Sequence, residues 1–190
     1  MPKIFSYKVG PEIGEILMSH EGQNLDFWQE QITNKSQRFV FAVNLLHQLI
    51  VGLKKIHELG YAHCDLKPDN ICARRDSKGS LRFSLIDLGL TTRLLRLGEH
   101  QASPKFRGNL MYASPMHLKF MRTSEWDDIY SLMCVVLLFI HQVLPWISYL
   151  EQRMCDDSNN DNIGTSMFKL FRIEHHVKFN IDLIKNSGAL

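Results

Sequence analysis

The residues best suited to chemistry lie in one polar segment, His63–Asn70, and at Asp87, which follows it. Carboxylate and amide oxygens such as those of Asp87 and Asn70 are hard ligands of the type that Mg²⁺ prefers. The ammonium of Lys67 can neutralise a phosphate, and the carboxylate of Asp65 can accept a proton from an attacking hydroxyl. Together these groups meet the needs of phosphoryl transfer, in which positioning and charge neutralisation supply most of the catalysis.

Two regular elements must position this segment. Before it, apolar residues recur at helical spacing and predict a long helix that begins at Ser36, and Gly60 suits the left-handed cap that ends it. After it, Ile71–Arg74 and Leu81–Leu85 are predicted to pair as a hairpin around the turn Asp76–Gly79. Because the hairpin returns the chain to its starting point, we expect both carboxylates to converge beside the polar segment.

The rest of the sequence predicts a mixed, mainly helical chain. Two short strands are expected at Ile4–Val9 and Glu15–Met18, and Asn24 can cap a short helix after them. The segment Trp126–Val143 is apolar on nearly all sides, which is typical of a helix in the middle of a core. The polar stretch Cys155–Thr165 is expected to be a surface loop, followed by one or two helices.

Composition excludes several classes of protein. The chain has 190 residues, of which 45% are hydrophobic and 22% charged, and this fits one folded domain rather than a disordered chain. Its formal charge of +2 is too close to zero to indicate binding to nucleic acid or to an anionic membrane. The longest apolar run, Leu132–Ile140, is shorter than the roughly 20 residues that a bilayer span needs.

The cysteines and the N-terminal residues indicate in which cellular compartment the protein is expected. None of the four cysteines (Cys64, Cys72, Cys134 and Cys155) has the spacing of a metal site. Their even number leaves a disulfide open, but free thiols in a reducing compartment are the better interpretation. The first residues lack the apolar stretch of a signal peptide. We therefore expect a cytoplasmic or nuclear protein with no membrane partner.

The segment His63–Asn70 resembles the protein kinase catalytic loop, H-x-D-L-K-P-x-N, in its serine/threonine form. Asp87–Gly89 resembles the D-F-G motif with leucine in place of phenylalanine. Later segments follow the order seen in casein kinase 1-like kinases: Gly108–Ser114, with an Ala-Ser pair where most kinases have A-P-E, then His117-Leu118, Asp127–Leu132 and Leu144–Trp146. The resemblance extends from about Glu15 to Trp146.

This resemblance implies an α+β, mainly α fold: a protein kinase C-lobe with a remnant of the N-lobe sheet and hinge. Residues 1–18 would be the N-lobe strand remnant and residues 19–190 the C-lobe of a single, partial kinase domain. The implied activity is transfer of the γ-phosphoryl group of ATP to Ser or Thr of proteins, with Mg²⁺ as the metal cofactor.

The resemblance also implies residue roles. Asp65 corresponds to the catalytic base and Lys67 to the lysine that contacts the transferred phosphate, while Asn70 and Asp87 correspond to the magnesium ligands. Asp128 resembles the aspartate that ties the catalytic loop to the core. The gatekeeper, the hinge backbone and the residues lining the adenine and metal pocket would be Met18, Ser19, His20, Glu21, Cys72 and Ile86.

Simpler interpretations exist for each residue. A single aspartate or asparagine such as Asp65 or Asn70 is usually a turn or a cap, and only the joint pattern favours catalysis. Asp128 alone is typical of a helix N-cap, and His63 is expected to be a packed core residue rather than a base. Four basic residues resemble the basic activation segment of casein kinase 1-like kinases, which favours acidic or phosphorylated substrates there: Arg93, Arg96, Lys105 and Arg107. A solvated loop face explains these residues equally well.

The chain also departs from the family pattern. Cys64 replaces the usual arginine. Asn109 replaces a threonine that commonly bonds the catalytic aspartate and lysine, and because asparagine can still form hydrogen bonds, we expect this contact to be perturbed rather than lost. No Gly-rich phosphate loop, N-lobe lysine or partner glutamate precedes Met18. We therefore expect weak or no kinase activity from this chain alone. The alternative is a non-catalytic pseudokinase or kinase fragment that serves as a protein-interaction module. The sequence specifies neither the substrate nor the oligomeric state.

Overall fold

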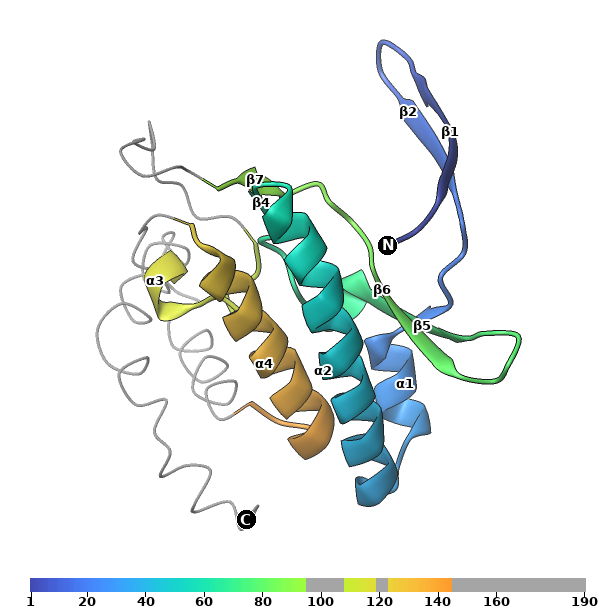
Figure 1. Ribbon diagram of the computed structural model, residues 1–190, viewed down its shortest axis with the longest axis vertical. Coiled ribbons are helices and arrows are strands. Elements are labelled where there is room, and N and C mark those ends of the chain that lie inside the picture. Colours follow the sequence, from blue (N-terminus) through green and yellow to red (C-terminus); the bar gives the residue numbers. More distant parts are fainter. Residues whose placement is uncertain (95–107, 119–122, 145–190) are drawn as a thin grey trace, which may run out of the picture.

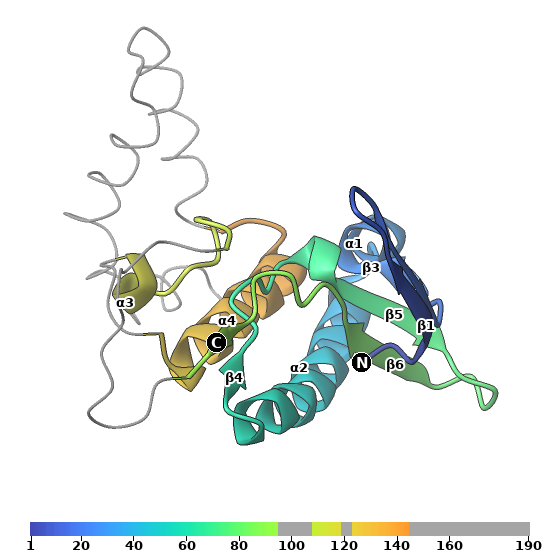
Figure 2. The same ribbon diagram turned by 90° about the horizontal axis from the view of Figure 1, so that it is seen from above.

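The computed structural model describes residues 1–94, 108–118 and 123–144. Two long helices, α2 (Lys35–Glu58) and α4 (Glu125–His141), lie side by side (Figure 1). Seen from above, α2 lies between α4 and a hairpin of β5 (Ile71–Arg75) and β6 (Leu81–Leu85) (Figure 2). The predicted α+β, mainly helical fold class is confirmed.

The core forms where α2, α4 and β6 meet. Phe41 of α2 stacks on Phe139 of α4, with ring centroids 4.5 Å apart, and meets Phe83 of β6 edge-on at 4.9 Å. The same core cluster contains fully buried aliphatic side chains: Leu45, Leu49, Leu53, Leu132 and Val135. Burial of each such side chain is worth about 1.5–3 kcal/mol. The three elements therefore make a rigid platform for the loops at their ends.

Helix α2 is the long helix that the apolar spacing predicts. It begins at Lys35, one residue before the expected Ser36, because the Asn34 side chain accepts the amide of Gln37 at 3.1 Å and caps it. Gly60 follows it with a φ of 82°, as predicted. Among the described helices, α2 alone has the length and hydropathy of a membrane span, and its buried face packs on α4 and β6 as the face of a core helix does.

Helix α4 corrects three expectations. It begins at Glu125 and ends at His141, whereas the sequence placed it at Trp126–Val143. Its N-cap is Ser124, so interpreting Asp128 as the cap is wrong. The helix is also not buried all round, because Trp126 is 76% exposed. The sequence identified this helix because its residues are apolar on nearly all sides, and seven of them are buried.

The β5–β6 hairpin forms as predicted. The side chain of Asp76 accepts the amides of Lys78 and Ser80, each at 2.9 Å, and this closes the turn. A short third strand, β3 (Gln23–Asn24), pairs antiparallel with β5. The remaining short elements are α1 (Leu25–Gln31), β4 (Tyr61–Ala62), the 3₁₀ helix η1 (Pro68–Asn70), β7 (Thr92–Arg93) and α3 (Pro115–Leu118), with β4 paired to β7.

Strands β1 (Ile4–Val9) and β2 (Gly14–Met18) form a separate hairpin that projects from the body (Figure 1). Both strands are predicted by the sequence, although β2 begins at Gly14 rather than Glu15. Every residue of the two strands is exposed. The division into strands 1–18 and a second part from residue 19 stays a prediction. The expected loop Cys155–Thr165 and the helices after it lie outside the described residues.

Candidate active site

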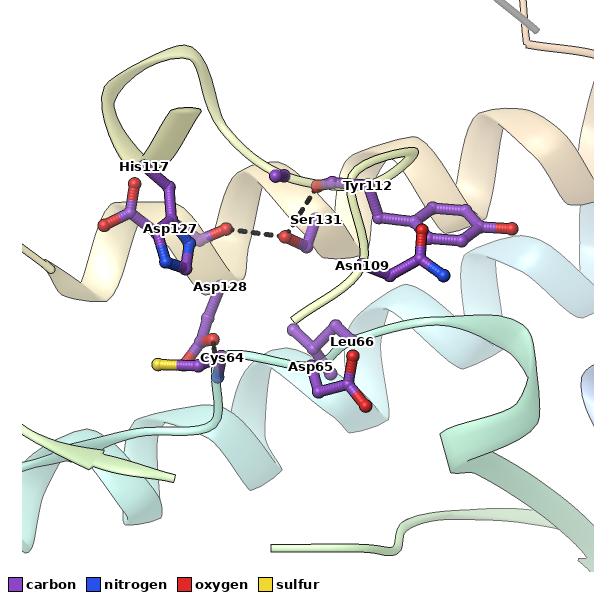
Figure 3. Close-up of a pocket in the computed structure, with 10 residues that line it drawn as sticks. Cys64, Asp65, Leu66, Asn109, Tyr112, His117, Asp127, Asp128 and Ser131 are labelled. Atoms are coloured by element: carbon purple, nitrogen blue, oxygen red, sulfur yellow. Dashed lines mark hydrogen bonds between the residues drawn. The ribbon is translucent and has the colours of Figure 1, made fainter. Parts of the chain in front are cut away.

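The polar segment His63–Asn70 is attached to the core through Asp128. The Asp128 carboxylate accepts the backbone amides of His63 at 2.8 Å and Cys64 at 2.9 Å. Its Oδ2 also lies 2.8 Å from Nε2 of His57, in the last turn of α2. Figure 3 shows Asp128 directly beside Cys64. The expectation that Asp128 ties this loop to the core is confirmed. The contribution of His57 was missed, since nothing in its local sequence marks it.

His63 is a buried core residue, as expected. Its Nδ1 accepts the amide of Asp65 at 3.3 Å, and its Nε2 lies 3.2 Å from the carbonyl oxygen of Ile86. Since Nδ1 acts as an acceptor, Nε2 carries the proton and donates it to that carbonyl. One ring therefore joins the polar loop to the residue that precedes Asp87, so the two motifs keep a fixed relation to each other.

Asp65, Lys67 and Asn70 are brought together by the turn that η1 makes. The Asn70 side-chain amide donates to the Asp65 carbonyl at 2.9 Å and to its carboxylate Oδ2 at 2.8 Å. Lys67 Nζ lies 3.4 Å from the same Oδ2. Asp65 and Asn70 are buried, whereas Lys67 stays partly open to solvent. A carboxylate is thus held in one orientation beside a cation, at a loop that solvent can reach.

Asp87 follows the end of β6, two residues after Leu85. The amide of Ile86 donates to the carbonyl of Asn70 at 3.0 Å, which fixes the chain just before Asp87. Asp87 has a φ of 59°, a left-handed conformation that aspartate tolerates better than most residues. Its carboxylate is exposed and accepts the amide of Gly89 at 3.0 Å. The backbone just before Asp87 therefore contacts the polar loop, and the meeting of the two carboxylates stays a prediction.

The donors near the loop suit a magnesium ion that keeps part of its water shell. Within the described ranges, no group of three or more His, Cys, Asp or Glu side chains could hold a metal by itself. Mg²⁺ usually binds one or two carboxylates together with substrate phosphates and water rather than a full protein cage. Asn70 and Asp87, one amide oxygen and one carboxylate, fit that limited role.

The other predicted nucleotide-binding residues lie on strands β2 and β5 and in the segments that follow β2 and β6. Met18 ends β2 and is half-exposed, while Ser19 and Glu21 follow in the connection to β3. Cys72 is buried in β5, and burial followed by the charge of Glu21 raises the pKa of its thiol. Ile86 is half-buried and bonded to the polar loop. The sequence did not show that the Glu21 side chain itself is buried, because its partners are distant in the chain.

The segment after residue 107 closes over the polar loop. Gly108 has a φ of 96°, and a Cβ atom there would lie only 2.1 Å from the carbonyl oxygen of Cys64. Asn109 lines a small pocket with Asp65 and Leu66 (Figure 3). Its side-chain oxygen accepts the amide of Met111 at 2.9 Å, so this oxygen bonds within its own turn.

The charge near the polar loop depends on the protonation of the Cys64 thiol and on the four basic residues identified in the sequence. Burial, and then the nearby Asp128 carboxylate, raise the pKa of Cys64 to about 11, so the thiol is neutral and does not replace the charge of an arginine. Of the four basic residues, Arg93 lies in β7. The other three, Arg96, Lys105 and Arg107, lie outside the described residues.

Comparison with known proteins identifies the family to which this chain is similar. The protein kinase domain family matches residues 15–186. A casein kinase 1-like protein of rice (Oryza sativa subsp. japonica) is 37% identical over 143 residues, which cover 70% of this chain and 20% of that protein. A serine/threonine-protein kinase/endoribonuclease of the same organism is 27% identical over 160 residues, 82% of this chain and 16% of that protein. The chain thus spans a fifth or less of the length of these relatives.

Proposed function

This chain belongs to the protein kinase domain family, and we propose that it carries the catalytic-loop half of a casein kinase 1-like, ATP-dependent serine/threonine protein kinase site. The observation that carries the proposal is the hydrogen-bonded set of Asp65, Lys67 and Asn70, with Asp87 fixed beside it by the bond between Ile86 and Asn70. These are the residue types, in one place, that phosphoryl transfer to a hydroxyl requires.

Each residue has a defined task in this proposal. Asp65 accepts the proton of the attacking hydroxyl, and the bond from Asn70 to its Oδ2 keeps the carboxylate in one orientation. Lys67, 3.4 Å from that oxygen, places a positive charge where the transferred phosphate would arrive. Asn70 and Asp87 would hold Mg²⁺. When bound, ATP supplies the phosphoryl group and Mg²⁺ neutralises its charge.

We further propose that the substrates are proteins, acidic or already phosphorylated near the target hydroxyl. The basic residues that include Arg93 support this, because cationic side chains attract phosphate and carboxylate groups. A cytoplasmic or nuclear location is supported by the free thiols of the three described cysteines, Cys64, Cys72 and Cys134.

A second function has one specific observation in its favour. The β1–β2 hairpin exposes large apolar side chains: Ile4, Phe5, Tyr7, Val9, Ile13, Ile16, Leu17 and Met18. Exposed apolar clusters of this kind mark surfaces that another polypeptide covers. A non-catalytic pseudokinase or kinase fragment acting as a protein-interaction module would use such a surface.

A phosphotransfer assay with Mg²⁺-ATP and an acidic protein substrate separates the two functions. Wild type is compared with Asp65→Asn, which removes the base, and with Asp87→Ala, which removes a metal ligand. Glu58→Gln is the matched control, because Glu58 is exposed and pairs with Lys54 on the surface. Loss of a general base should lower the rate by about 10²–10⁴-fold.

The two functions predict different results. Transfer by wild type and by Glu58→Gln, with loss in both other variants, supports the kinase. Absence of transfer in all four proteins, with a partner protein still bound, supports the interaction module. Equal transfer by wild type and Asp65→Asn would overturn the role given to Asp65.

A further inference from the structure

A second buried polar cluster lies where the β1–β2 hairpin joins the body. We propose that Glu21 is a positioning residue whose carboxylate fixes the backbone of residues 19–24 on the β5–β6 hairpin, and so sets that backbone for the adenine of a nucleotide. The four residues Ser19, Glu21, Arg74 and Ser84 are called the Glu21 network below. The inference rests on the proposed function, because the adenine site at residues 19–21 is part of it.

Both carboxylate oxygens of Glu21 are occupied, although its neighbours come from different parts of the chain. Ser84 Oγ of β6 donates to Oε2 at 2.6 Å, and Arg74 Nε of β5 lies 3.5 Å from the same oxygen. Ser19 Oγ donates to Oε1 at 2.5 Å. Since Glu21 is only 8% exposed, these partners replace the water that its charge would otherwise hold.

The network also reaches the projecting hairpin. The Ser19 hydroxyl accepts the backbone amide of Lys3 at 2.7 Å while it donates to Glu21. The Ser19 amide in turn donates to the Lys3 carbonyl at 2.8 Å. The base of the β1–β2 hairpin is therefore linked to β5 and β6 through one carboxylate.

The electrostatics show that this site is built for a charged carboxylate. Burial by itself would raise the pKa of Glu21, but the hydrogen bonds from Ser19 and Ser84 and the charge of Arg74 outweigh it, and the pKa lies below its usual value. The charged form is therefore the one that the neighbouring groups stabilise. An acid merely left in an apolar pocket would show the opposite shift.

The residues after Glu21 show why its position matters for the backbone. Gly22 has a φ of 93°, and a Cβ atom there would lie 2.2 Å from the carbonyl oxygen of Ala73. Gln23 pairs with Ala73 in the β3–β5 ladder, and Trp28 Nε1 donates to the same carbonyl at 3.1 Å. The chain thus runs in close contact with β5 from Glu21 onward.

On the other side of Glu21 the contacts are few. Strands β1 and β2 pack chiefly on each other and are exposed throughout. Residues 19 and 20, whose backbone would face a nucleotide base, therefore depend on the Glu21 network for a fixed position. A positioning role, rather than a contribution to core stability alone, follows from this location.

The test uses the full chain and four variants. Glu21→Leu removes both charge and acceptors, Glu21→Gln keeps one acceptor oxygen without the charge, and Ser84→Ala removes one donor. Glu12→Gln is the matched control, since Glu12 is an exposed glutamate in the β1–β2 turn. Amide hydrogen exchange of residues 19–24 is measured first, because it needs no ligand. Binding of Mg²⁺-ADP and the KM for ATP against kcat are measured second.

We expect amide exchange of residues 19–24 to quicken about tenfold in Glu21→Leu and less in Glu21→Gln and Ser84→Ala, with the amides of α2 unchanged. The Kd for Mg²⁺-ADP and the KM for ATP should rise about tenfold in Glu21→Leu while kcat stays within about twofold, because only ground-state positioning is lost. The Glu12→Gln variant should match wild type in every measurement.

Unchanged exchange at residues 19–24 in Glu21→Leu would overturn the inference. Faster exchange with unchanged nucleotide affinity would overturn the link to adenine. If wild type binds no Mg²⁺-ADP, the proposed function fails, and the exchange data alone decide whether Glu21 fixes this backbone.

Discussion

The carboxylate of Asp128 accepts the backbone amide of His63 at 2.8 Å, although 65 positions separate the two residues in the chain. The same carboxylate binds the next amide, that of Cys64, and the ring of His57. Because Cys64 has a φ of 66°, the loop turns there in a conformation that few side chains favour. The Asp128 bonds to these two successive amides fix the backbone that leads into this turn and on to Asp65.

Replacing Asp128 should therefore destabilise the fold and the loop together. Asp128→Asn keeps the shape but offers only one oxygen acceptor, and a buried donor left unpaired costs about 1–3 kcal/mol. Urea unfolding should show a lower midpoint for Asp128→Asn than for wild type. Glu58→Gln, an exposed substitution, should leave the midpoint unchanged. Equal midpoints for Asp128→Asn and wild type would contradict the anchoring role.

A side chain at Gly108 should be unfavourable for two reasons, the positive φ and the close approach of the Cys64 carbonyl. Comparison with a second glycine separates the two effects. Gly108 and Gly79 both have positive φ, 96° and 79°, and an added Cβ would meet Cys64 at Gly108 but nothing within 4 Å at Gly79. Gly79→Ala should cost about 1–2 kcal/mol from the left-handed conformation alone. Gly108→Ala should cost more and should also weaken phosphotransfer, because the Cys64 carbonyl and the loop must move. Similar unfolding free energies for both variants would argue against the close approach.

Asp26 should make stability depend on pH. Partial burial, and then the neighbouring Asp69 carboxylate, raise the pKa of Asp26 to about 6. Since the folded-state pKa lies above the ordinary value, protonation favours folding, and this stabilisation is lost as pH rises through about 6. The variant Asp26→Asn cannot ionise, so its Tm relative to wild type should increase between about pH 4 and pH 6 and stay constant above that range.

Two further variants test whether Asp26 and its neighbour Asp69 cause this pH dependence. Asp69→Asn should reduce the pH dependence of the wild-type Tm, because it removes the main charged neighbour of Asp26. Glu58→Gln should shift Tm by the same small amount at each pH. A Tm difference between Asp26→Asn and wild type that does not vary with pH would show that folding does not raise the pKa of Asp26.

The sequence by itself determined the local structure and the family. Apolar residues at helical spacing predicted α2, and a segment apolar on nearly all sides predicted α4. The turn at Asp76 predicted the β5–β6 hairpin, and the motif around Asp65 indicated a protein kinase. These features depend on residues close together in the chain, where helical period, turn chemistry and capping act directly. The sequence placed the start of α4 one residue late, an error of the size that is usual at helix ends.

The tertiary structure decided which polar side chains meet across the chain. The burial of Glu21 against Ser84, the contact of His57 with Asp128, and the bonds from Gln48 to the backbone of β6 each join residues far apart in sequence. No periodicity marks such pairs, because a buried polar group is stabilised only by the partner that folding brings to it. The catalytic motif could be read from the sequence, but the contacts that hold it in place exist only in the folded chain.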